Sequence, residues 1–160
     1  MEGGKKVITV ICTGNICRSP MAEHLLQHAL QAQPHPLSDY QVISAGVSAY
    51  PGDAASRNSI IALDKVNLDL SDHRSRPLTD QLVEVSDLIL TMTSSHADII
   101  RMRYPNIGIP VLRFREWIPS GSREVPDPFG GPLQIYLDTR DSLAEAVPSI
   151  LNYLKTEFEA

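Results

Sequence analysis

Both cysteines of the chain lie in one short segment, CTGNICRSP, at residues 12–20. Cys12 and Cys17 flank a Gly-Asn pair, and Arg18 and Ser19 follow directly. Such residues occur in disulfides, in metal sites and in loops that hold an anion. Two cysteines in a chain without a recognisable export signal favour reduced thiols. The CxxxxC spacing is not typical of zinc, which needs about four ligands. The third possibility depends on the flanking elements.

The segment lies between a predicted strand and a predicted helix. Residues 7–12 (VITVIC) form a β-branched apolar run, typical of a strand buried on both faces. Ser19 suits a helix N-cap and Pro20 the first helical position, so the N-terminus of the helix would add partial positive charge. Gly and Asn tolerate positive φ and allow backbone N–H groups to turn inward. These features predict a phosphate-sized cradle built from Thr13, Gly14, Asn15, Ile16, Cys17 and Ser19.

Cys12 opens this loop and Arg18 closes it six positions later. Inward N–H donors, the helix dipole and a guanidinium would all favour the thiolate of Cys12. Arg18 can hold two oxygens of a phosphoryl group at once, and the Ser19 hydroxyl can donate to the thiolate. A Cys six residues before an Arg is common by chance, and a Cys at a strand end is more often part of the core. The coincidence of strand, turn and helix favours a nucleophile beneath a bound phosphate.

A phosphoryl transfer of this kind also needs a proton donor for the leaving group. Asp127, in EVPDPFGG, is the best candidate because Pro126 and Pro128 restrict its backbone and its loop can reach the predicted site. An Asp between two prolines is usually only a turn residue. Together with the Cys-Arg loop, it becomes the predicted general acid.

The remaining patterns predict an α/β fold. Beside the strand at 7–12, strands are expected at 40–45, 87–92 and 109–114, and helices at about 19–31, 54–65, 79–85, 94–103 and 132–158, with a break or kink at Pro148. Alternating strands and helices indicate a parallel sheet with helices on both faces. We therefore expect a three-layer, doubly wound single domain over residues 1–160, with about four strands. Its ligand crevice lies beyond the carboxyl ends of the strands, where the Cys-Arg loop falls.

Composition excludes several other classes of function. A net charge of −5 disfavours sequence-independent binding to nucleic acid. No apolar run approaches the roughly 18 residues of a membrane helix, and the MEGGKK start does not resemble a signal peptide, so a cytoplasmic location is expected. His24 and His28 are spaced as a metal-binding pair, but they fall on the polar face of the first helix, where a solvated surface is the simpler interpretation. No metal or cofactor is predicted.

Nearly the whole chain resembles the low-molecular-weight protein-tyrosine phosphatases, including their bacterial protein-arginine-phosphatase branch. The resemblance rests on five motifs in the family's order and spacing: CTGNICRSPMAE (12–23), ISAG (43–46), LSDHRSRPLT (70–79), DLILTM (87–92) and DPFGG (127–131). It implies that Cys12, Arg18 and Asp127 are the nucleophile, the phosphate-binding residue and the general acid. It also implies that Ser44 and His73 join Asn15 in a hydrogen-bond network that supports the loop. Without it, they would be interpreted as a turn residue and a surface histidine.

The resemblance implies a two-step, metal-free reaction on a phosphorylated protein. Cys12 forms a cysteinyl phosphate while Asp127 protonates the leaving group, and Asp127 then activates water to hydrolyse it. Inorganic phosphate is the product and an expected inhibitor. Cys17 is expected either to form a reversible, protective disulfide with Cys12 or to be a packed thiol.

Two features of the sequence point to different substrates. Ile16 matches the tyrosine phosphatases, whereas the arginine branch carries Thr there; Tyr50 and Phe129 are expected to wall the slot for an aromatic ring. DPFGG is closer to the arginine branch, because tyrosine phosphatases commonly have a second aromatic residue where Gly130 stands. Phosphotyrosine is the favoured substrate and phosphoarginine the alternative. A related arsenate reductase would need further cysteines, and a non-catalytic phosphopeptide-binding module would not need Cys12 or Asp127.

Overall fold

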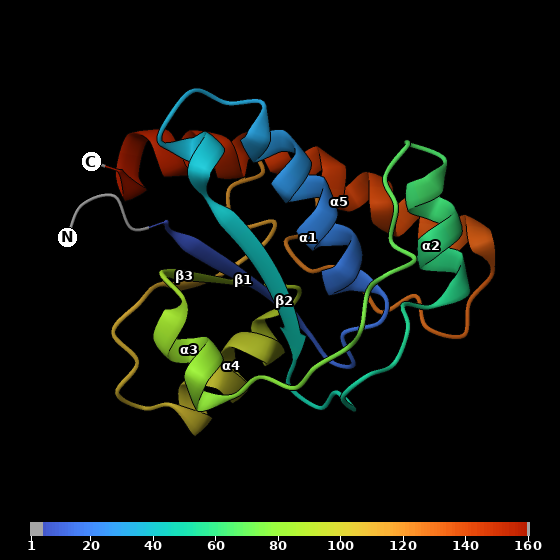
Figure 1. The fold of residues 1–160 in the computed structure, drawn as a ribbon, viewed down its shortest axis with the longest axis horizontal. Helices are drawn as coiled ribbons and strands as arrows, with labels where there is room; N and C mark the ends of the chain where they lie inside the picture. The colour runs from blue at the N-terminus through green and yellow to red at the C-terminus, as the bar shows by residue number, and fades with distance from the viewer. Residues whose placement is uncertain (1–4, 160) are drawn as a thin grey trace.

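A four-stranded parallel sheet forms the centre of the computed structural model, which describes residues 5–159 (Figure 1). The strands are β1 (Val7–Cys12), β2 (Gln41–Gly46), β3 (Leu88–Thr91) and β4 (Val111–Arg113), in the order β2-β1-β3-β4. All three neighbouring pairs are parallel. The four predicted strands are confirmed to within two residues at each end. Residues 1–4 and 160 of the expected domain, and most of the MEGGKK start, lie outside the described residues.

Helices cover both faces of the sheet (Figure 1). On one face lie α1 (Arg18–Gln31), α2 (Arg57–Asp64) and α5 (Leu133–Tyr153), and on the other α3 (Asp80–Val85) and α4 (Ser94–Arg103). A 3₁₀ turn at Leu37–Asp39 precedes β2, and a π-helical turn at Leu154–Phe158 follows α5. Thr79 caps α3, because its side chain accepts a hydrogen bond from the Leu82 N–H at 3.3 Å. Within residues 5–159 no helix combines the length and apolar character of a membrane span.

The alternation of side chains along the strands builds two cores. Ile8 and Val10 of β1 point into the core beneath α1 and α5, whereas Ile11 points into the core beneath α3 and α4. Leu90 and Ile89 of β3 divide in the same way. Because successive residues of a strand face opposite sides, a strand covered on both faces is apolar at nearly every position. The predicted three-layer α/β fold is confirmed.

For the helices, the N-cap predicted at Ser19 is wrong, and the break predicted at Pro148 does not occur. Helix α1 begins at Arg18 with Cys17 at the N-cap position, so Ser19 is not its cap. The Ser19 hydroxyl is engaged instead by Cys12 and Asn15, which lie in the loop before the helix. Helix α5 is not broken at Pro148. Its buried residues Val147 and Ile150, on either side of the proline, pack into the same core, and a proline removes only one helical N–H donor.

Close backbone contacts fix the loop that follows β1 against the end of β2. The N–H groups of Val47 and Ser48 donate to the carbonyl oxygens of Cys12 and Thr13 at 3.0 and 2.9 Å. A Cβ atom on Gly46 would lie 2.4 Å from the Thr13 carbonyl oxygen, so only glycine allows this approach. The glycine of the ISAG motif therefore has a steric role in shaping the loop.

Candidate active site

The Cys12 sulfur lies at the carboxyl end of β1 and is contacted by two hydrogen-bond donors. The backbone N–H of Asn15 donates to Cys12 Sγ at 3.2 Å, and the Ser19 Oγ lies 2.9 Å from the same sulfur. The Ser19 oxygen accepts a hydrogen bond from Asn15 Nδ2 at 2.8 Å, so its own proton is free to point at Cys12. Donors aimed at a sulfur favour the thiolate over the thiol.

Asn15 is the residue that holds the loop in shape. It is in the left-handed region, with φ of 58°, a conformation that costs a non-glycine residue roughly 1–2 kcal/mol. Every polar group of Asn15 nevertheless has a partner. Besides its bonds to Cys12 and Ser19, Nδ2 donates to Ser44 Oγ at 3.0 Å, Oδ1 accepts from the Arg76 N–H at 3.0 Å, and the carbonyl accepts from His73 Nε2 at 2.7 Å. These five bonds offset the strain.

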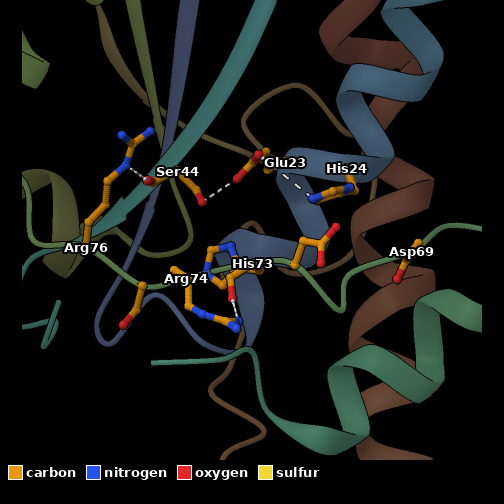
Figure 2. Close-up of a pocket in the computed structure, with 9 residues that line it drawn as sticks. Glu23, His24, Ser44, Asp69, His73, Arg74 and Arg76 are labelled. Atoms are coloured by element: carbon orange, nitrogen blue, oxygen red, sulfur yellow. Dashed lines mark hydrogen bonds and ion pairs between the residues drawn. The ribbon is translucent and has the colours of Figure 1, made fainter. Parts of the chain in front are cut away.

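The support behind Asn15 extends to side chains that sequence reasoning did not single out (Figure 2). The Ser44 hydroxyl donates to Glu23 Oε1 at 2.5 Å, and Arg76 Nε donates to the Ser44 carbonyl at 3.1 Å. These side chains line a pocket of about 480 Å³ together with His24, Asp69, Asp72, His73, Arg74 and Ser75. Glu23 lies within CTGNICRSPMAE and Arg76 within LSDHRSRPLT, so the family motifs already contained both of these supporting residues. Ser44 and His73 lie where the resemblance places them.

Arg18 is buried and its guanidinium is fixed at two points. Nη1 donates to the Val125 carbonyl at 2.9 Å and Nη2 donates to Thr13 Oγ1 at 3.3 Å. Its Nε is buried and has no partner within residues 5–159. In the same described range, the backbone N–H groups of Gly14, Ile16 and Cys17 donate to no protein group. Convergent N–H donors beside a guanidinium fit the oxygens of a phosphoryl group.

Asp127 lies beside Arg18 and is half exposed. Its Oδ2 lies 3.7 Å from Arg18 Nη2, and its Oδ1 accepts a hydrogen bond from the Phe129 N–H at 3.0 Å. The segment before Asp127 is held by Val125, whose N–H donates to the Met92 carbonyl at 2.9 Å and whose carbonyl accepts from Arg18. The structure thus brings the predicted general acid beside the predicted phosphate-binding residue.

These residues enclose a second pocket, of about 230 Å³. It is lined by Cys12, Thr13, Gly14, Ile16, Cys17, Arg18, Asp127 and Phe129. Ile16 and Phe129 give it apolar walls, as the sequence predicts. Tyr50 is not brought to this pocket: its side chain is 79% exposed and does not line it.

Cys17 is a buried free thiol, like Cys12. Its sulfur lies 3.5 Å from both Ser56 Oγ and Tyr136 OH. Burial raises the pKa of Cys17, although its two hydrogen bonds act in the opposite direction. Among residues 5–159, no group of three or more His, Cys, Asp and Glu side chains is arranged to hold a metal ion.

His96, in the first turn of α4, is a site residue that sequence reasoning missed. Its Nε2 lies 2.9 Å from Thr13 Oγ1, and the side chain is buried. Burial, followed by the charge of Arg18, lowers the pKa of His96 to about 4. The DLILTM motif ends four residues earlier, and nothing in the sequence separates His96 from an ordinary helical histidine.

The buried histidines make stability depend on pH. Burial lowers the pKa of both His73 and His96 below the ordinary value of 6.5, so unfolding at mildly acidic pH takes up protons. The free energy of unfolding should therefore fall as the pH decreases from about 6.5 towards about 4. Urea titrations across this range should show a smaller fall in the variant His96→Gln, because glutamine does not titrate and only the contribution of His73 remains of the two. An identical pH dependence in the two proteins would contradict the assignment of His96 as a neutral imidazole.

Comparison with known proteins agrees with this geometry. The family model for low molecular weight phosphotyrosine protein phosphatase matches residues 7–160. The chain is 37% identical over 150 residues to the protein-arginine-phosphatase of Bacillus subtilis, covering 94% of this chain and 97% of that protein. It is 37% identical over 122 residues to the low molecular weight protein-tyrosine-phosphatase Wzb of Escherichia coli K12, covering 76% and 77% of the two chains.

A solved structure gives the same result. The low molecular weight protein tyrosine phosphatase from T. tengcongensis superimposes with a TM-score of 0.84 at 32% identity, covering 94% of this chain and all of that one. The fold, the loop around Cys12 and these relatives agree on one family of enzymes. The chain belongs to the low molecular weight phosphotyrosine protein phosphatases.

Proposed function

We propose that this protein hydrolyses phosphotyrosine in protein substrates through a cysteinyl-phosphate intermediate. The observation that carries the proposal is the pocket above Cys12, in which the apolar side chains of Ile16 and Phe129 flank the nucleophile and Arg18. The ring of a phosphotyrosine is flat and apolar, so it fits between such walls while its phosphoryl group enters the cradle.

In the first step, the thiolate of Cys12 attacks phosphorus opposite the bond to the leaving oxygen. The S–P bond forms as the P–O bond breaks, and the carboxyl proton of Asp127 passes to the departing tyrosine oxygen. Arg18 and the inward N–H groups hold the three remaining oxygens, on which negative charge is concentrated in the transition state.

In the second step, the carboxylate of Asp127 takes a proton from water as the water oxygen attacks phosphorus. The S–P bond breaks, inorganic phosphate is released, and the Ser19 hydroxyl stabilises the returning thiolate of Cys12. The side chains of this chain supply every group that the cycle needs. Because phosphate fits the same cradle, it should act as a competitive inhibitor.

A protein-arginine phosphatase is the second candidate, and the loop after Asp127 favours it. Gly130, with φ of 82°, and Gly131 follow Phe129, so the DPFGG segment carries no second aromatic side chain beside the pocket residue Phe129. The similar protein from Bacillus subtilis is named a protein-arginine-phosphatase and matches 94% of this chain. The same two-step reaction would then break a P–N bond, with a guanidine as the leaving group.

Rates on matched phosphotyrosyl and phosphoarginyl peptides distinguish the two candidates. The wild-type protein should prefer phosphotyrosine, and Ile16→Thr should shift the ratio of kcat/KM values towards phosphoarginine by roughly 10-fold or more, because a lost apolar contact to the ring has about that effect. The control Ile16→Val, which keeps an apolar wall, should retain the preference. A wild-type preference for phosphoarginine would show that the open Gly130-Gly131 mouth outweighs Ile16 and would overturn the phosphotyrosine assignment.

We further propose that residues 1–160 form one catalytic domain whose macromolecular partners are phosphorylated proteins. The net charge of −5 gives no general attraction to nucleic acid. The mechanism requires Cys12 to remain a free thiol, a state that the reducing cytoplasm maintains, so this is the compartment we propose.

A further inference from the structure

We propose that His96 is a positioning residue that acts through Thr13 to orient the guanidinium of Arg18 towards the phosphoryl group. This inference rests on the proposed phosphatase function and adds a residue from α4, on the far side of the sheet from α1, to the machinery of the loop.

A continuous chain of contacts links the three residues. His96 Nε2 lies 2.9 Å from Thr13 Oγ1, and the same oxygen lies 3.3 Å from Arg18 Nη2. The backbone of His96 is fixed as well, because its N–H donates to the N-cap residue Thr93 at 3.2 Å. His96 is only 4% exposed. Its backbone and its ring are therefore both held in place, and the ring can fix the position of the Thr13 side chain.

The donors available determine where the hydrogens lie in this series of contacts between His96, Thr13 and Arg18. A guanidinium only donates, so Thr13 Oγ1 must accept from Arg18. A neutral imidazole can complete the contact either by accepting the Thr13 hydroxyl proton or by donating its own. Burial and the positive charge of Arg18 keep His96 neutral, against the opposing effect of Glu124 and Asp127. The contact therefore places no second cation beside Arg18.

The other ring nitrogen of His96 indicates that the residue is not there for packing alone. Nδ1 is buried and has no hydrogen-bond partner within residues 5–159. A buried polar atom without a partner is costly, and an apolar side chain at this position would avoid the cost. Among residues 5–159, the only polar contact that its imidazole makes is the one to Thr13, and an apolar residue could not supply this contact.

Orientation matters because Arg18 must present two N–H groups in one plane to the phosphoryl oxygens. The Val125 carbonyl fixes Nη1 and Thr13 fixes Nη2, so the buried Nε, which has no partner within residues 5–159, remains available to a phosphoryl oxygen. Without Thr13 in place, the guanidinium can rotate about its bond to the side chain. A loss of this alignment lowers the affinity for both the ground state and the transition state of the phosphoryl group.

The test compares two substitutions of His96. His96→Leu should lower kcat/KM by roughly 3- to 10-fold, the effect of one neutral hydrogen bond, and by the same factor for aryl phosphates with good and poor leaving groups. His96→Gln, whose amide reaches about as far as Nε2, should restore most of the rate. Both variants should remain folded at the assay temperature, as thermal melts would show, and His28→Leu, on the exposed face of α1, should leave these rates unchanged.

Binding of inorganic phosphate to Cys12→Ser, with and without His96→Leu, separates this inference from the proposed reaction. A several-fold weaker phosphate affinity in the double variant supports the positioning role even if the wild-type protein proves inactive on phosphotyrosine. Unchanged phosphate affinity, or a Gln variant as impaired as the Leu variant, would overturn it. If His96→Leu fails to fold, Thr13→Val must reproduce the loss and Thr13→Ser must not, and a failure of that pattern would equally overturn it.

Discussion

Replacing Cys12 with serine should lower turnover of a phosphotyrosyl peptide by about four orders of magnitude or more while leaving phosphate binding intact. A serine hydroxyl beside the Asn15 N–H and the Ser19 hydroxyl stays protonated at neutral pH and cannot displace a phenol efficiently. The backbone donors of the loop and the Arg18 guanidinium, which bind the oxygens, are untouched. Steady-state rates and a phosphate titration of the same variant measure the two properties.

Arg18→Ala is the matched control for this experiment. Because Arg18 contacts the anion and not the leaving group, its loss should impair phosphate binding and turnover together, whereas Cys12→Ser should separate them. Turnover retained by Cys12→Ser would exclude a covalent intermediate on that residue. Phosphate binding lost by Cys12→Ser and kept by Arg18→Ala would show that the cradle does not hold the anion as proposed.

Replacing Asp127 with alanine should produce a loss that depends on the leaving group. An alkyl phosphate or a phosphotyrosyl peptide needs a proton on its departing oxygen, so kcat/KM should fall by roughly 10²- to 10⁴-fold. An aryl phosphate whose phenol is a good leaving group needs little protonation, and its kcat/KM should fall far less. Comparing kcat/KM isolates the steps up to loss of the leaving group, before Asp127 acts as a base in the second step.

Asp138→Ala is a suitable control, because Asp138 is an exposed carboxylate on α5 that pairs with Gln134 and does not line the pocket. It should leave both classes of substrate unaffected. Equal losses for good and poor leaving groups in Asp127→Ala would assign Asp127 a structural role, for example in the turn that its Oδ1 makes with the Phe129 N–H.

Local patterns predicted most of the frame around the site. Five of residues 7–12 are apolar because β1 is central and covered on both faces. The sixth, Thr9, is β-branched, and its hydroxyl lies 2.6 Å from Ser86 Oγ. The cradle was also predictable. The residues that bend and line it are adjacent in sequence, and Asn15 does adopt the left-handed conformation that the Gly-Asn pair suggested.

The predictions that were wrong, and the site residue that was missed, depend on contacts between residues far apart in the sequence. Ser19 is a residue type that often caps helices, but its hydroxyl contacts Cys12 and Asn15 instead. The helix begins at Arg18, two residues before the first helical position that such a cap would set. Tyr50 is aromatic and was expected to wall the substrate slot, yet its side chain is exposed to solvent. The bond between Thr13 and His96 joins residues 83 positions apart, a distance over which a single sequence carries no local signal.

Trapping the cysteinyl phosphate on Cys12 would test the proposed mechanism most directly. The wild-type protein would be mixed with an excess of an aryl phosphate, quenched in acid during turnover, and analysed by mass spectrometry of the intact chain and its peptides. We expect one added phosphoryl group, on the peptide that carries Cys12, and none when Cys12→Ser is treated in parallel. Turnover without a phosphorylated protein, or a phosphoryl group on any other residue, would contradict it.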